Sequence, residues 1–217
     1  MRGAVRDDIT VKLKGETAGQ LAKKNLSYDA GFMLEPGPYT IRFLARENET
    51  GKMGTFESKF TVPDLTTETR WLPISSVVLS HQRERLSAAV ANVQGKDKKL
   101  IAANPLIQNG EKLVPSVTRV FRKGQDMLVY LEAYQPAAQN TQYMAAAVSF
   151  YRGGVKAFET APMQITEGLD PKSKAVPLRF SVPLDKLEPG RYTCQVSVVS
   201  PEAKKFAVWR APMVLLP

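Results

Sequence analysis

The stretch LEPGPYT at residues 34–40 recurs, with one change, as LEPGRYT at residues 187–193. In each copy a Pro-Gly turn precedes a tyrosine at the start of a strand-like run. This order is typical of a tyrosine corner in an immunoglobulin-like β-sandwich, where the ring enters the core and the hydroxyl bonds back to nearby backbone. We therefore predict that Tyr39 and Tyr192 are structural corner residues of two such units. Stacking of these rings on a ligand is the alternative, which is weaker because aromatic residues on alternating strands normally belong to the core.

Regularly spaced apolar runs surround the second copy of the repeat. They are rich in Val, Ile, Phe and Tyr, alternate with a period of two, and are bounded by Gly and Pro, as in the strands of a sandwich. Gly153-Gly154 between two of them predicts a tight two-residue hairpin. A set of about eight strands is enough for a complete two-sheet sandwich. The predicted strands are ISSVVL (74–79), SVTRVF (116–121), MLVYLEAY (127–134), AAAVSFYR (145–152), VKAFETAPMQI (155–165), AVPLRFSVPL (175–184), YTCQVSVVS (192–200) and FAVWRAPMVLL (206–216).

Fewer strand candidates surround the first copy. Residues 39–45 and 55–62 alternate and flank a turn at residues 49–52, in which a glycine can supply a positive φ, so a hairpin is predicted. Only ITVKL (9–13) and LSYDAGFML (26–34) resemble strands before the corner. Because roughly three or four strands cover only part of a sandwich, we expect the first unit to be incomplete, with its remaining strands upstream of this chain.

These patterns predict an all-β chain of two immunoglobulin-like or fibronectin-like β-sandwich units. Residues 1–64 are the partial unit, residues 65–71 the linker, and residues 72–217 the complete unit, with an irregular insertion around residues 81–111. We expect residues 72–217 to be stable alone, because their strand set is complete.

The insertion fits the strand pattern poorly. Residues 82–93 predict a short amphipathic helix, whereas GKDKK (95–99) and NPLIQNGEK (104–112) predict surface loop.

The charge balance is basic, with 30 Lys and Arg against 21 Asp and Glu and a net charge of +9. Such an excess favours anionic partners. The basic residues are nevertheless spread along the chain, and the densest cluster, Lys96, Lys98 and Lys99, lacks the interleaved aromatic residues of nucleic-acid-binding surfaces. We therefore expect a solvated basic surface and no nucleic-acid partner. Contact with a polyanion is the alternative.

Export signals are not visible in this chain. The start MRGAVRDDITVKLKG (1–15) is charged and has no apolar core, so no signal peptide is predicted. No run approaches the roughly 18 apolar residues of a spanning helix, so no transmembrane segment is predicted.

The residues for common catalytic chemistry are missing from the sequence. The single histidine, His81, follows Ser80 on a predicted strand, where neighbours point to opposite faces and do not form a dyad. The single cysteine, Cys194, lies within a strand-like run and is expected to be a small buried hydrophobe. One His and one Cys cannot supply a zinc site, and Asp7-Asp8 is a weak calcium candidate at best. We predict that the chain is not an enzyme and has no catalytic, cofactor-binding or metal-binding residues.

Two tryptophans are the candidate binding residues. Trp71 lies in the predicted linker and Trp209 in the last predicted strand. An exposed tryptophan on a β-sheet protein can stack on a sugar ring or anchor a protein partner. The favoured interpretation is nevertheless that Trp71 packs between the two units and Trp209 packs in the second core, and binding is the alternative.

Three long segments resemble the C-terminal region of VWFA-related proteins from Acidobacteria and their neighbours. They are LSYDAGFMLEPGPYTIRFLARENETGKMGTFESKFTVPDL (26–65), NPLIQNGEKLVPSVTRVFRKGQDMLVYLEAYQP (104–136) and the segment from FYRGG to the end (150–217). The resemblance implies an exported protein, extracellular or in the cell envelope, in which β-rich modules follow a von Willebrand factor A domain. The D-x-S-x-S metal loop of that domain is absent from this sequence, so none of the family's metal-binding residues can be assigned to it.

The expected function is therefore a non-catalytic structural or adhesive interaction module that binds a protein through the edges or loops of its sandwich. A carbohydrate-binding module that uses Trp71 or Trp209 is the first alternative, with polysaccharide as its partner. A hydrolase whose residues meet only in the folded chain is the second.

Overall fold

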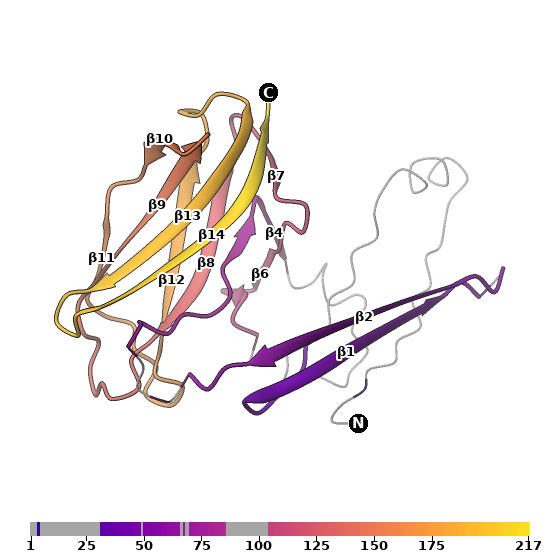
Figure 1. Ribbon diagram of the computed structural model, residues 1–217, viewed down its shortest axis with the longest axis horizontal. Helices are drawn as coiled ribbons and strands as arrows, with labels where there is room; N and C mark the ends of the chain where they lie inside the picture. The colour runs from indigo at the N-terminus through magenta and orange to yellow at the C-terminus, as the bar shows by residue number, and fades with distance from the viewer. Residues whose placement is uncertain (1–3, 5–30, 49, 66, 68–69, 86–103) are drawn as a thin grey trace. The chain divides into compact units, whose positions relative to one another are not determined.

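The computed structural model describes residue 4 and residues 31–48, 50–65, 67, 70–85 and 104–217. Every regular element in these ranges is a β-strand, and no helix occurs in them. The predicted all-β class is confirmed. Figure 1 shows the strands, numbered in chain order.

The chain divides into two compact units, one made of residues 1–35 and 85–112 and the other of residues 36–84 and 113–217. The second unit contains the hairpin, the six-stranded sheet and one of the two three-stranded sheets. The domain boundaries expected from the sequence, at residues 64 and 72, remain a prediction.

Strands β1 (Gly37–Arg46) and β2 (Met53–Val62) form an antiparallel hairpin (Figure 1). In the turn, Gly51 has a φ of 71° and the Glu47 amide donates to the Lys52 carbonyl at 2.8 Å. The predicted hairpin, including the glycine with a positive φ, is confirmed.

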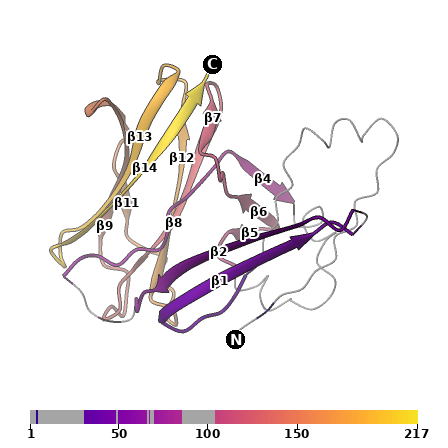
Figure 2. The ribbon, with the colours of Figure 1, turned by 45° about the vertical axis from the view of Figure 1, so that its right-hand side comes forward.

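The largest sheet has the strand order β10-β9-β13-β14-β7, and β11 also pairs with β9. Figure 2 labels β7, β9, β11, β13 and β14 of this sheet. All its pairs are antiparallel except β14 with β7, which is parallel. Gly153 and Gly154, with φ of 57° and 84°, form the predicted tight turn between β9 and β10. The strands are β7 (Val120–Arg122), β9 (Met144–Arg152), β10 (Val155–Glu159), β11 (Met163–Ile165), β13 (Gly190–Ser200) and β14 (Lys205–Leu216).

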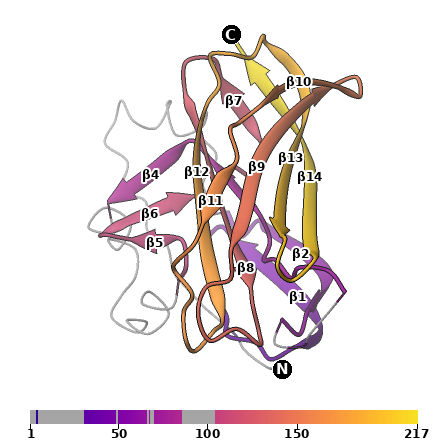
Figure 3. The ribbon, with the colours of Figure 1, turned by 90° about the vertical axis from the view of Figure 1, so that its left-hand side faces the viewer.

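A second sheet has the order β12-β8-β3 and is antiparallel throughout. Figure 3 labels β8 and β12 of this sheet. Its strands are β3 (Val78–Ser80), β8 (Asp126–Tyr134) and β12 (Ala175–Pro183). Ile74 adds an isolated bridge to Ala133.

One hydrophobic core takes side chains from both sheets. Burial alternates along the strands, since side chains of successive residues point to opposite faces. Cys194 is fully buried in this core, as predicted. Fully buried side chains include Met127, Leu131, Leu178 and Val182 from the three-stranded sheet and Met144, Val148, Phe150, Val196 and Val198 from the larger one.

Two expectations for residues 81–111 are wrong where the structure describes them. Gln82–Arg85 is strand β4 and not the start of a helix, while residues 86–93 of the expected helix lie outside the described residues. The sequence Gln-Arg-Glu-Arg has no apolar residue, so a helix here would have no apolar stripe in its first turn.

The segment expected to be loop at residues 104–112 instead contains a short hairpin. Strand β5 (Ile107–Gln108) pairs with the start of β6 (Glu111–Val114). Asn109 and Gly110 between them have φ of 52° and 76°, and Asn-Gly is the preferred sequence of such a tight turn.

Three of the predicted strands are shorter than expected. The strand at residues 74–79 is regular only from Val78, and the one at residues 116–121 only from Val120, just after Arg119 with a φ of 52°. The run at residues 155–165 divides into β10 and β11 around Pro162, which has no amide to donate to a ladder.

Candidate functional site

The tyrosine of the second repeat makes the contact that its sequence pattern predicts. The Tyr192 hydroxyl donates to the backbone carbonyl of Glu188 at 2.6 Å, and the ring is 5% exposed. Gly190 has a φ of 155°, a conformation that favours glycine, and Leu187 is buried in the core. These contacts give Tyr192 a structural role.

The tyrosine of the first repeat has different surroundings. Tyr39 is half-buried on β1, and its ring stacks on Phe60 of β2 with 5.8 Å between the centroids. Gly37 has a φ of 148°, close to that of Gly190, so the two Pro-Gly turns share a backbone conformation.

The two candidate tryptophans lie in different environments. Trp209 of β14 is half-buried and packs against the hydrophobic core. Trp71 is 52% exposed, its ring meets that of Phe206 edge-on at 4.9 Å, and the Arg70 guanidinium lies 5.4 Å from its centroid. The Leu72 amide donates to the Phe206 carbonyl at 3.1 Å, which fixes this segment beside the start of β14.

Trp71 belongs to a group of exposed apolar side chains that we name the outer strip: Trp71, Val199, Phe206 and Val208. Val199 lies opposite Phe206 across β13 and β14, and Val208 is two residues further along β14 on the same face. The exposed fractions of Val199, Phe206 and Val208 are 44%, 46% and 47%. Ala207 between the two β14 residues is buried, so the strip lies on the face of the sheet that points away from the core.

On the same face, the outer strip is bordered by small alanine side chains of β9 and by polar side chains further along β13 and β14. Ala145 of β9 lies opposite Val199, and Ala147 lies opposite Ser197. Beyond Ser197 the Arg210 guanidinium donates to the Gln195 side chain at 2.6 Å, and Gln195 donates to Ser197 at 2.8 Å. The apolar area is therefore confined to the end of the sheet where β13 ends and β14 begins.

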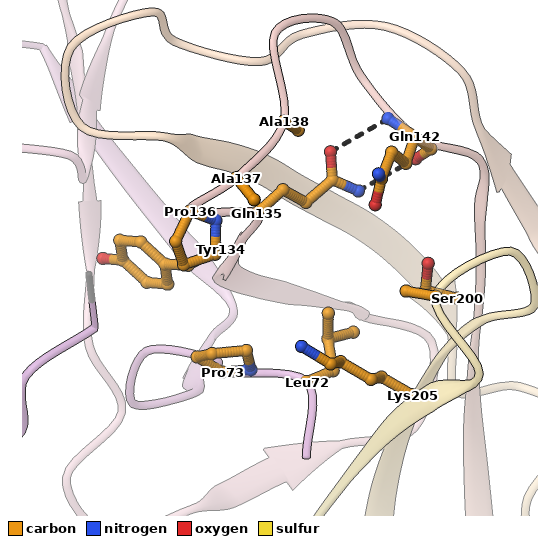
Figure 4. Close-up of a pocket in the computed structure, with 11 residues that line it drawn as sticks. Leu72, Pro73, Tyr134, Gln135, Pro136, Ala137, Ala138, Gln142, Ser200 and Lys205 are labelled. Carbon is orange, nitrogen blue, oxygen red and sulfur yellow. Dashed lines mark hydrogen bonds between the residues drawn. The ribbon is translucent and has the colours of Figure 1, made fainter. Parts of the chain in front are cut away.

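A small cavity lies at that same end, and we name it the end pocket (Figure 4). Its volume is about 260 Å³. No carboxylate is among the residues that line it, which are Leu72, Pro73, Tyr134, Gln135, Pro136, Ala137, Ala138, Gln142, Ser200, Ala203 and Lys205.

Hydrogen bonds hold the loop that forms one side of the end pocket. The buried Gln135 side chain donates to the Gln142 carbonyl and accepts from the Gln142 amide, both at 2.9 Å (Figure 4). The Lys174 ammonium donates to the Ala138 carbonyl at 3.0 Å. The Ser200 hydroxyl donates to the Tyr143 carbonyl at 3.3 Å. A loop held in this way gives the pocket a preformed wall.

The end pocket and the outer strip are contiguous. Leu72 lines the pocket and follows Trp71 of the strip, while Lys205 lines the pocket and precedes Phe206. The hydrogen bond from Leu72 to Phe206 joins the two segments. A partner that packs on the strip can therefore reach the pocket.

A carboxylate held by two tyrosines lies on β8. Glu132 accepts from the Tyr130 hydroxyl at 2.8 Å and from the Tyr134 hydroxyl at 2.7 Å. Burial, and then the hydrogen bond to Glu132, raise the pKa of both tyrosines well above the ordinary value. The Arg179 guanidinium lies 5.0 Å from the centroid of the Tyr130 ring. Because the neutral phenols are favoured, Tyr130 and Tyr134 donate to the Glu132 carboxylate as neutral hydroxyl groups.

The structure places the other reactive residues in bonded or buried positions. The Ser80 hydroxyl bonds to the Gln82 carbonyl at 2.9 Å, and the His81 ring packs edge-on against Phe121 at 6.0 Å. Burial raises the pKa of the Cys194 thiol to about 12, which disfavours the reactive thiolate. Among the described residues, no three His, Cys, Asp or Glu side chains lie close enough to hold a metal ion. No described helix is long and apolar enough to cross a membrane.

Sequence reasoning found Trp71 but missed its partners on the strip and the pocket. A signal was present in Phe206-Ala207-Val208-Trp209, where four successive apolar residues make both faces of β14 apolar. The pocket has no sequence signal, because its lining comes from four separate segments.

Neither a scan of protein-family models nor a search of curated protein sequences matches the chain to a known family or relative. The resemblance to VWFA-related proteins therefore stays a prediction.

Proposed function

We propose that the chain is a non-catalytic interaction module that binds a partner protein through the outer strip. The observation that carries this proposal is the grouping of Trp71, Val199, Phe206 and Val208 on one face, each between 44% and 52% exposed. Single exposed apolar side chains are normal on soluble proteins, whereas a contiguous group marks an interaction surface. Trp and Arg, present here as Trp71 and Arg70, are also enriched among the residues that dominate binding energy.

The proposal includes an immunoglobulin-like sandwich as the scaffold. The strand orders β12-β8-β3 and β10-β9-β13-β14-β7, with a shared core, are those expected when two sheets pack face to face. The Tyr192 bond at the turn before β13 supports the same assignment. In this setting the module would be one of the β-rich domains of an exported VWFA-related protein.

Three of the edge strands, β12, β3 and β7, are less suited to binding than this face. Edge strand β12 contains Pro177 and Pro183, and proline removes amides that a partner strand would need. Edge strands β3 and β7 have only three residues each. We therefore propose the outer strip, and not one of these three edges, as the principal contact.

Polysaccharide is the second candidate partner, and the exposure of Trp71 favours it. The ring is, however, already in contact with Phe206 and with the Arg70 guanidinium, which leaves less of it open to a sugar. This competition places a protein partner first.

The experiment is a quantitative pull-down from envelope and culture-supernatant fractions with the whole chain. The wild type is compared with Phe206→Ser, and the control is Val155→Ser, since Val155 is 72% exposed on the edge strand β10. We expect the wild type and the control to retain the same protein and Phe206→Ser to lose it. Equal retention by Phe206→Ser would refute the assignment of the strip. Retention on polysaccharide resin, without a protein partner, would establish the second candidate.

A further inference from the structure

Positive charge gathers around the end pocket. Lys205 lines the pocket, and Lys204 precedes it in the turn between β13 and β14. The Lys174 ammonium bonds to Ala138 on the loop that lines the pocket. Arg70 lies over Trp71 on the adjoining strip. Four cations thus come from three separate segments of the chain.

The acidic residues near the pocket compensate this charge only in part. Glu202 lies in the same turn as Lys204, and Asp170 lies in the turn that ends at Lys174, whose amide donates to the Asp170 carbonyl at 2.9 Å. Glu132 accepts the hydroxyl of Tyr134, which lines the pocket, but its two oxygens are already bonded to tyrosines. Among the described residues named here, four cations thus stand against three carboxylates, and this small excess of positive charge favours the association of an acidic group.

The pocket has room for one apolar side chain. An engineered apolar cavity of roughly 150 Å³ holds a benzene molecule, so about 260 Å³ is large enough for an aromatic or branched aliphatic side chain. Leu72, Pro73, Pro136 and three alanines supply apolar lining. Polar lining groups are partly engaged, because Gln135 and Ser200 bond to backbone.

We propose that the end pocket and the outer strip together dock an acidic segment of a partner protein. One apolar side chain of the segment fills the pocket, its neighbours pack on Phe206 and Val208, and its carboxylates lie near Lys204 and Arg70. This inference rests on the proposed function and specifies the chemistry of the partner. A polysaccharide fits the site less well, because Gln135 and Ser200, two of the polar residues that line the pocket, already bond to backbone groups.

The test is a selection of phage-displayed random dodecapeptides on the whole chain, followed by affinity measurements with the selected peptides. We expect the selected peptides to be acidic and to share an aromatic or branched apolar residue. Selection of neutral or basic peptides would overturn the proposal. A chain that selects no peptide but binds an anionic polysaccharide such as polygalacturonate would also overturn it.

Two variants separate the roles of the pocket and of the charge. Ala137→Phe narrows the pocket from an exposed position that tolerates a larger side chain, and we expect affinity to fall about tenfold, as for the loss of a central anchor. Lys204→Glu should weaken binding about two- to fivefold, with the effect shrinking as salt is added. The matched control is Arg191→Glu, at the opposite end of β13 and about 30 Å away along the strand, which should leave affinity unchanged.

The outcomes distinguish this inference from the function beneath it. Phe206→Ser could abolish peptide binding while Ala137→Phe leaves it unchanged. In that case the pocket is not the anchor site and this inference is wrong, but the outer strip remains the binding surface. If neither variant changes binding, both the inference and the proposed function fall. Circular dichroism of each variant confirms that the fold is retained.

Discussion

Removal of the Tyr192 hydroxyl is the sharpest test of the proposed corner. In Tyr192→Phe the ring remains in the core, where it is 5% exposed, and only the hydrogen bond to the Glu188 carbonyl at 2.6 Å is lost. A net intramolecular hydrogen bond contributes about 1 kcal/mol, and a buried group left without a partner can cost up to about 3 kcal/mol. Because Glu188 is exposed, water can reach its carbonyl. The loss of stability should therefore lie near about 1 kcal/mol.

We therefore expect Tyr192→Phe to lower the free energy of unfolding by about 1 kcal/mol, which corresponds to a fall in melting temperature of about 2–4 °C for a domain of this size. The assay is urea unfolding followed by tryptophan fluorescence, in which the midpoint shifts while the slope stays constant. The matched control is Tyr151→Phe on β9, since Tyr151 is half-buried in the same sheet and the described contacts include no hydrogen bond of its hydroxyl. Tyr151→Phe should change the free energy of unfolding by less than about 0.5 kcal/mol.

The reasoning would be refuted if the two variants were equally stable. Such a result would mean that the Tyr192 hydroxyl contributes no more than an ordinary surface phenol. A loss well above about 3 kcal/mol would also contradict it, because that size requires a cavity or a buried unpaired charge. Tyr192→Ala serves as the comparison, since loss of the whole ring should lower the free energy of unfolding by about 3–5 kcal/mol.

Three further predictions follow from burial and charge. The Cys194 thiol should resist iodoacetamide at pH 8 (about half a unit below an ordinary thiol pKa) in the folded protein and react in denaturant; rapid labelling of the folded protein would contradict its burial. The pKa of Glu159 should be lower than ordinary, because Lys156 and then Ser149 bond to its carboxylate. Lys156→Met should raise this pKa in an NMR titration, and an unchanged pKa would show that Lys156 does not pair with Glu159 in solution. Since a lowered pKa favours the folded state above the ordinary value, this small contribution should disappear as the pH falls through the folded-state pKa. A fragment of residues 72–217, which contains every strand of the six-stranded sheet and of the sheet β12-β8-β3, should melt cooperatively, and a broad transition would contradict that.

The parts of the fold that sequence predicted are those with local signals. The Pro-Gly-Tyr repeat predicted the Tyr192 bond, because that bond joins residues four apart in the chain. The hairpins at Gly51 and at Gly153-Gly154 were predictable because positive φ favours glycine. The Asn109-Gly110 hairpin was missed although it has the same kind of signal, since the flanking strands β5 and β6 are short and only half apolar.

The candidate site could not be predicted, because it depends on contacts between distant segments. Val199 and Phe206 become neighbours only through the register of β13 with β14, and Trp71 joins them through the bond from Leu72 to Phe206. Trp71 was singled out by its residue type, but its exposed fraction of 52% follows from packing beside β14.

The measurement that tests the central claim most directly is photo-crosslinking of the whole chain in envelope and supernatant fractions. One sample carries p-benzoylphenylalanine in place of Val208 on the outer strip, and the other carries it in place of Val155 on β10. Val155 is the more exposed position, at 72% against 47%, so random collisions favour it. We predict a discrete protein adduct from position 208 and none from position 155. Adducts of equal yield at both positions, or from position 155 alone, would contradict the assignment of the outer strip as the binding surface.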